Sequence, residues 1–135
     1  MLDLRIQQHF IDSADLHYQV AQGLAKPVEA AVQAVLACVT GGGKVLTAGM
    51  GPSTGLAQYL ASLLVGGFER ERPGLSALAL SADALMATLW SDAQGLASQV
   101  RALGHTGDVL FLISALGDEP ILVQAVHAAH EREMS

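Results

Sequence analysis

The chain has 135 residues, 51% of them apolar, and a formal net charge of −6 at pH 7. That length suits one domain with a buried core. Its seven lysines and arginines form no basic stripe, which argues against direct binding to nucleic acid. The mean hydropathy of +0.39 is high for a soluble monomer, but each uninterrupted apolar run is too short to cross a bilayer. We therefore expect apolar surface buried between subunits, and no membrane partner.

Two features of the composition indicate a cytoplasmic protein. Cys38 is the single cysteine, so no internal disulfide can form, and it lies in an apolar helical pattern typical of a core residue. Residues 1–17 carry charged and glutamine side chains where a signal peptide would have an apolar core.

The first 40 residues have the apolar spacing of helices. Apolar residues recur at helical intervals from Leu2 to Leu24, and Gly23 is expected to close this first helix. Pro27 is typical of a first helical position, so we expect a second helix that ends at the three glycines of residues 41–43. Residues 1–40 are thus predicted to form a helical hairpin.

The most informative stretch is residues 44–64, which reads as a strand, a glycine turn and a helix. A short apolar run predicts a buried parallel strand, and Gly49 and Gly51 then allow a sharp turn. Either Ser53 or Thr54 can cap the helix that follows, whose apolar residues have the spacing of one buried stripe. Backbone N–H groups at such a turn point toward an anion.

The rest of the chain alternates strands and helices. The predicted elements are a strand at 75–80, a short helix at 84–89 with Trp90 as its buried anchor, a helix at 95–103, a strand at 109–114 and a helix from Pro120 to about Glu133. This order predicts a three-layer α/β/α fold with a parallel sheet, in which residues 44–133 form a βαβαβα core. A sheet of about three strands has an open edge that invites pairing.

Several separated segments together resemble the SIS (sugar isomerase) domain. They are residues 49–53 (GMGPS), 68–73 (FERERP), 100–110 (VRALGHTGDVL) and 113–114. The branch is the one that holds phosphoheptose isomerase and the DnaA initiator-associating protein DiaA. The resemblance implies a flavodoxin- or Rossmann-like parallel sheet of five strands, assembled as homodimers or homotetramers with phosphosugar sites between subunits. Against that pattern, residues 1–135 would be a single, incomplete SIS domain without its last two strands.

The resemblance implies a phosphosugar site on two loops, built from Gly49, Met50, Gly51, Ser53 and Thr54 in the first loop and Ser114 and Gly117 in the second. Several departures predict that this site is degenerate. Met50 replaces the usual asparagine, and Pro52 lacks the N–H group that a phosphate could have used. Asp118 and Glu119 bring negative charge to the position of the dianion, and neither loop contains a lysine or arginine.

The isomerase reaction moves a proton between C1 and C2 of a ketose and requires a positioned base and acid. By the resemblance, the metal-binding histidine falls on Tyr59 and the catalytic glutamate on Leu63, so we expect no catalytic residue here. The first hypothesis is therefore a non-catalytic, oligomeric adaptor resembling DiaA, with the initiator DnaA as its partner. The alternative is a phosphosugar-binding protein or residual phosphoheptose isomerase acting on sedoheptulose 7-phosphate in lipopolysaccharide heptose synthesis. A third hypothesis is a truncated copy without function.

Other kinds of site fit the residues less well, and we expect neither a cofactor nor a metal. A dinucleotide fingerprint would need a third glycine where Thr54 stands, and no Gly-Lys-Ser/Thr follows the turn as in a P-loop. His127 and His130 are spaced to share a metal beside Glu131, but a third ligand is missing. Ser53 as a helix cap and Ser114 as a strand-end hydroxyl need no ligand at all, so both interpretations of these serines stay open.

Overall fold

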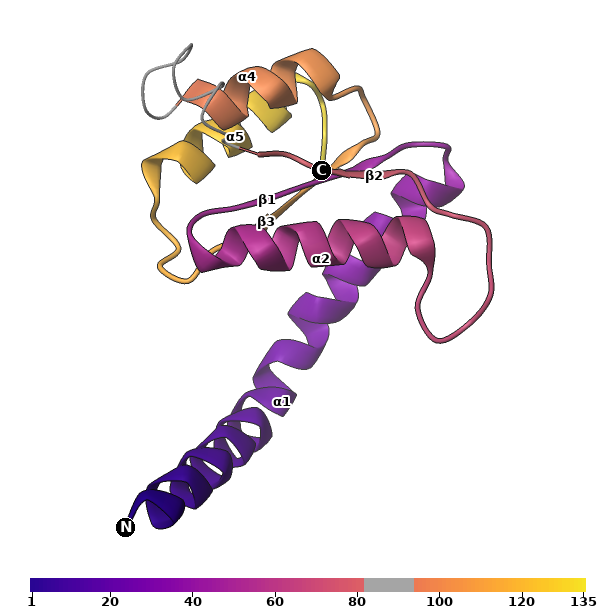
Figure 1. The fold of residues 1–135 in the computed structure, drawn as a ribbon. Helices are drawn as coiled ribbons and strands as arrows, with labels where there is room; N and C mark the ends of the chain where they lie inside the picture. Colours follow the sequence, from indigo (N-terminus) through magenta and orange to yellow (C-terminus); the bar gives the residue numbers. More distant parts are fainter. Residues whose placement is uncertain (82–93) are drawn as a thin grey trace. The chain divides into compact units, whose positions relative to one another are not determined.

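The computed structural model describes residues 1–81 and 94–135 (Figure 1). Along the chain these form α1 (Leu2–Thr40), β1 (Val45–Gly49), α2 (Pro52–Gly66), β2 (Ala77–Ala79), α4 (Gln94–Leu103), β3 (Val109–Ile113) and α5 (Pro120–Glu131). The chain separates into two compact units, residues 1–34 and residues 35–135, and we describe each by itself. The helix predicted at 84–89 and its anchor Trp90 lie outside the described residues.

In the first unit, residues 2–34 form one uninterrupted helix, the first part of α1, with Gly23 and Pro27 inside it. The prediction of two successive helices is therefore wrong, because no hairpin turn occurs before residue 40. A proline inside a helix removes one hydrogen bond, here to the carbonyl of Gly23, and its ring crowds that same carbonyl. The flanking alanines, leucine and glutamines favour a helix, and Gly23 leaves the backbone room to adjust, so α1 continues through this point.

The helix α1 is also long and apolar enough, by length and composition alone, to cross a membrane. The last turns of α1 belong to the second unit and contribute to its core. Val35, Cys38 and Val39 pack against Val45 of β1 and Val109 of β3. The absence of a membrane partner and the cytoplasmic location stay predictions.

The sheet has three parallel strands in the order β2-β1-β3. Val45 of the central strand β1 aligns with Ala77 of β2 on one side and with Val109 of β3 on the other. All five residues of β1 are buried, as expected for a parallel strand that is covered on both faces. The predicted α/β class and the parallel sheet are confirmed, and each strand bound lies within two residues of the predicted one.

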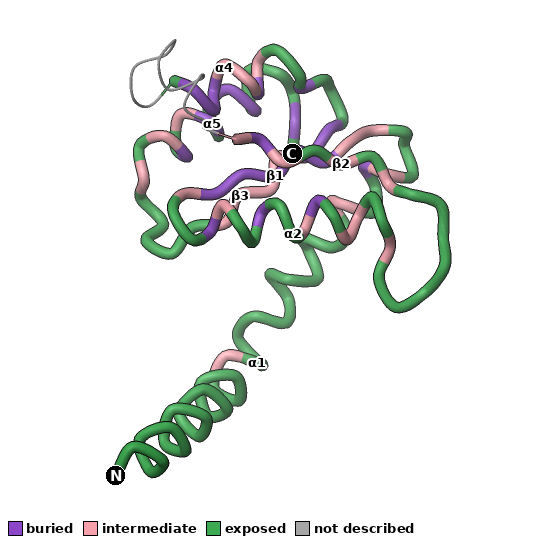
Figure 2. The backbone as a smooth tube through the Cα atoms, viewed as in Figure 1, coloured by how far each residue is buried: buried purple, intermediate pink, exposed green. Residues whose placement is uncertain are grey.

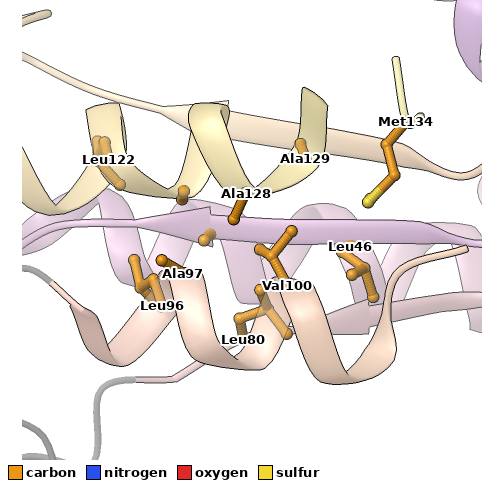
Figure 3. Close-up of a cluster of buried hydrophobic side chains, with 11 residues drawn as sticks. Leu46, Leu80, Leu96, Ala97, Val100, Leu122, Ala128, Ala129 and Met134 are labelled. Atoms are coloured by element: carbon orange, nitrogen blue, oxygen red, sulfur yellow. The ribbon is translucent and has the colours of Figure 1, made fainter. Parts of the chain in front are cut away.

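Helices cover both faces of the sheet, so the second unit has three layers (Figures 1 and 2). On one face, Leu46 of β1 packs in a cluster with residues of α4 and α5, including Leu96, Val100 and Ala128 (Figure 3). On the other face, Val45 lies in a smaller cluster with Leu64 of α2 and the end of α1. The alternation of β1 side chains between the two clusters is the ordinary alternation of a strand.

The side of α2 that faces the sheet carries small residues. Ser53, Ala57 and Ala61 are its buried positions, and Thr47 of β1 donates a buried hydrogen bond of 2.8 Å from Oγ1 to the carbonyl of Ala57. The larger apolar residues Leu56, Tyr59 and Val65 are all more than half exposed. The predicted buried stripe of apolar residues is therefore formed only in part, since Ala57 and Ala61 are buried and Leu56 is exposed.

Candidate functional site

The two predicted loops lie at the same end of the sheet. Gly49 at the end of β1 aligns with Ile113 at the end of β3, so the loops that begin at Met50 and Ser114 leave neighbouring strands. From β1 the chain continues into α2 on one face, and from β3 it continues into α5 on the other (Figure 1). In open parallel sheets, ligands bind in the crevice at the carboxyl ends of two such strands.

The first loop needs both of its glycines. A Cβ atom on Gly49 would lie 2.5 Å from the backbone oxygen of Ser53, and Gly51 has φ +54° and ψ −129°, a conformation nearly restricted to glycine. Gly51 is the N-cap residue of α2, and Pro52 is its first helical residue. The prediction that Ser53 or Thr54 caps this helix is wrong, because Pro52 has the φ of a first turn and starts the helix earlier.

Two backbone N–H donors of the first loop are paired within the loop. The N–H of Ser53 donates to the carbonyl of Met50 at 3.0 Å, and the N–H of Thr54 donates to the carbonyl of Gly51 at 3.1 Å. The hydroxyl of Thr54 donates to the carbonyl of Gly49 at 3.0 Å. Ser53 is buried, and Met50 packs against the larger core cluster. We therefore expect the second loop to supply most of any contact with an anion.

The second loop is more open and holds its own carboxylate. Ser114 is exposed and accepts a 2.7 Å hydrogen bond from the N–H of Gly117, which has φ +83°. The Ser114 hydroxyl in turn donates to the carboxylate of Glu119, the N-cap residue of α5. That hydrogen bond, together with backbone N–H groups of the same loop, lowers the pKa of the Glu119 carboxyl. A cavity of about 160 Å³ adjoins the loop, with apolar walls that include Leu122 and Val126.

Comparisons with known proteins decide the family. Residues 8–135 match the SIS domain family. The chain belongs to the SIS domain family. It is 50% identical over 139 residues to the phosphoheptose isomerase of Methylibium petroleiphilum, covering 100% of this chain and 70% of that protein. It is 43% identical over 136 residues to the phosphoheptose isomerase of Aromatoleum aromaticum, covering 96% of this chain and 68% of that protein.

Solved structures agree with this assignment. The phosphoheptose isomerase from Francisella tularensis superimposes with a TM-score of 0.91 at 35% identity, over 100% of this chain and 73% of that one. The phosphoheptose isomerase GmhA from Neisseria gonorrhoeae gives a TM-score of 0.89 at 33% identity, over 99% of this chain and 72% of that one. The predicted resemblance to the SIS domain and its phosphoheptose isomerase branch is therefore confirmed.

Other predicted positions of this SIS domain lie apart from the two loops. Tyr59 is exposed and Leu63 half-buried, both on α2. His127 and His130 are exposed on α5, but the carboxylate of Glu131 beside them pairs with Arg101 at 2.7 Å. Among residues 1–81 and 94–135, no three His, Cys, Asp or Glu side chains are placed to hold a metal ion.

One interaction of the SIS domain escaped the sequence analysis. Asp108, directly before β3, is 3% exposed and accepts hydrogen bonds from the backbone N–H of Lys44 at 2.9 Å, from the Lys44 ammonium and from the N–H of His105 at 2.8 Å. Cys38 lies nearby and donates from Sγ to the carbonyl of Lys44 at 3.3 Å, and burial raises the pKa of its thiol. These residues lie at the amino ends of β1 and β3, opposite the candidate site. The sequence offered one signal for this interaction, since Lys44 and Asp108 each stand directly before an apolar strand.

The close approach at Gly49 has a testable consequence. We expect Gly49→Ala to lower the free energy of unfolding by about 1–3 kcal/mol, because the added methyl group meets the rigid backbone of Ser53. Urea unfolding measures this change. Gly55→Ala is the matched control, because a Cβ atom at this position on α2 meets no atom within 4 Å. It should stabilise the domain by about 0.5–1 kcal/mol through the better helix propensity of alanine. Equal effects of the two changes would contradict the proposed close approach.

Proposed function

We propose that this SIS domain binds a phosphosugar, with sedoheptulose 7-phosphate as the ligand, at the carboxyl ends of β1 and β3. The observation that carries the proposal is the in-register pairing of Gly49 with Ile113, which brings the two loops to one crevice. The relatives that cover nearly all of this chain bear the name phosphoheptose isomerase, which supports the same ligand class.

The proposal is limited to binding. Proton transfer between C1 and C2 requires a base within hydrogen-bonding reach of the substrate carbon. By the family resemblance, the base and the metal ligand fall on Leu63 and Tyr59, and a leucine side chain cannot accept a proton. Binding needs only hydroxyl and N–H donors near the phosphate, and Ser114 offers an exposed hydroxyl at the crevice.

The adaptor hypothesis has less support than this alternative. The relatives described above are phosphoheptose isomerases rather than initiator-associating proteins. DnaA as a partner therefore stays a prediction, as does the homodimer or homotetramer. The exposed apolar side of α2, with Leu56, Tyr59 and Val65, would suit contact with a second subunit.

Calorimetric titration of sedoheptulose 7-phosphate into the purified chain tests the proposal. We expect saturable binding that weakens about tenfold in Ser114→Ala, because a hydrogen bond to a charged group contributes about 1.5–3 kcal/mol. Ser62→Ala is the matched control. Ser62 is an exposed serine on α2 whose hydroxyl donates to the carbonyl of Tyr59 at 2.7 Å, and its removal should leave binding unchanged.

Two outcomes would refute the proposal. One is the absence of any heat of binding on a chain that circular dichroism and urea unfolding show to be folded. The other is an equal loss of affinity in the Ser114 and Ser62 variants, which would place the ligand away from the crevice.

A further inference from the structure

The second loop holds a negative charge of its own at the proposed phosphate position. The hydroxyl of Ser114 donates to a carboxylate oxygen of Glu119, and the N–H of Gly117 donates to the oxygen of Ser114. Residues 114–119 contain no lysine or arginine that would neutralise this carboxylate. Glu119 also stands at the amino end of α5, where the helix favours an anion.

We infer that the carboxylate of Glu119 is an internal competitor of the phosphate group, which takes the Ser114 hydroxyl while the site is empty. The inference rests on the proposed function, since it concerns the regulation of the same site. To bind, a phosphate group has to displace the carboxylate from Ser114, and the two anions repel each other until Glu119 turns away. Glu119 thus weakens the binding of every phosphate at this site by the same factor.

The size of the effect follows from simple competition. If the carboxylate holds Ser114 in about nine of ten molecules, the apparent dissociation constant is about tenfold weaker than the intrinsic one. Removing the carboxylate should therefore tighten phosphate binding by about this factor. Removing a nearby charge that does not contact Ser114 should change binding by about twofold or less, because solvent and salt screen exposed charges.

The experiment compares Glu119→Ala with Asp118→Ala, which removes the same charge one residue earlier. In the described structure the Asp118 side chain makes no hydrogen bond to Ser114. Each variant and the unchanged chain are titrated with sedoheptulose 7-phosphate, with inorganic phosphate and with sedoheptulose. We expect Glu119→Ala to bind both phosphates about tenfold more tightly and to leave binding of the unphosphorylated sugar unchanged. Thermal unfolding of each variant checks that the chain stays folded.

The possible results separate the two proposals. Equal tightening in both variants would overturn the inference in favour of general charge repulsion. Binding that is lost in Ser114→Ala but unchanged in Glu119→Ala would overturn the inference and leave the proposed function standing. No phosphate binding in any folded variant, Glu119→Ala included, would overturn the proposed function and the inference with it.

Discussion

Replacing Asp108 with alanine is expected to lower the free energy of unfolding by about 3 kcal/mol. The carboxylate is almost fully buried and joins three donors, two of them backbone N–H groups. Without it, the N–H groups of Lys44 and His105 lose their acceptor inside the protein. The ammonium of Lys44, whose side chain is 24% exposed, can still turn toward water, which keeps the loss at the lower end of the range for broken buried ion pairs.

The same contact predicts a dependence on pH. Burial raises the pKa of the Asp108 carboxyl, but the hydrogen bonds from Lys44 and His105 outweigh it, and the pKa lies below its ordinary value. A carboxyl whose pKa is lower in the folded state stabilises the fold above its unfolded pKa of about 3.9, and this contribution is lost as the pH falls. The difference in stability between the unchanged chain and Asp108→Ala should therefore be largest near neutral pH and shrink below pH of about 4.

Urea unfolding at several pH values measures both effects. Glu131→Ala is the control, because this variant also removes one carboxylate of an ion pair. The pair of Glu131 with Arg101 is exposed, and such pairs contribute about 0–1 kcal/mol. If Asp108→Ala cost no more than Glu131→Ala, the Asp108 contacts would not contribute to stability as described.

Replacing Leu46 with alanine is the second large effect. Leu46 lies in the central strand, is fully buried and packs in the cluster between the sheet, α4 and α5 (Figure 3). Truncation of a fully buried leucine costs about 2–5 kcal/mol, the sum of the lost transfer energy and the cavity left behind. Because strands surround Leu46 on both sides, its backbone has little freedom to close the cavity, and we expect about 3 kcal/mol or more.

Leu56→Ala is the matched control for Leu46→Ala. It makes the same chemical change on α2, where the leucine is 56% exposed. We expect a change of about 0.5 kcal/mol or less in urea unfolding of the chain at low concentration. A similar cost at both positions would show that the cluster around Leu46 is not the main core of this unit.

The sequence predicted the α/β class because its signals are local. The apolar runs before Gly49 and after Asp108 indicate buried strands, and the helices between them require parallel pairing. Two local signals gave wrong results. Pro27 is typical of a helix start, but here it lies inside one continuous helix. Ser53 and Thr54 are typical helix caps, but Pro52 begins the helix before both of them.

The two loops of the candidate site follow predicted strands, and their binding of a phosphosugar stays a prediction. The strand order was not predicted, and the structure shows that β1 and β3 are neighbours with their ends in register. The contact between Ser114 and Glu119 depends on side-chain conformations within one loop, which periodicity does not show. The contacts of Asp108 with Lys44 join residues 64 positions apart. The sequence shows that each residue directly precedes an apolar strand, but it does not show that these two strands are neighbours.

The two sides of the helix α2 differ in the size of the side chains that they can carry. Its inner side admits only small residues, because Ser53, Ala57 and Ala61 lie against the sheet. Its outer side, with Leu56, Tyr59 and Val65, has no such limit of size from the sheet. Substitutions on the two sides should therefore be nearly additive, since they share no packing partner within the sheet. In evolution, the outer side can acquire or lose a binding surface while the inner side keeps the fold unchanged.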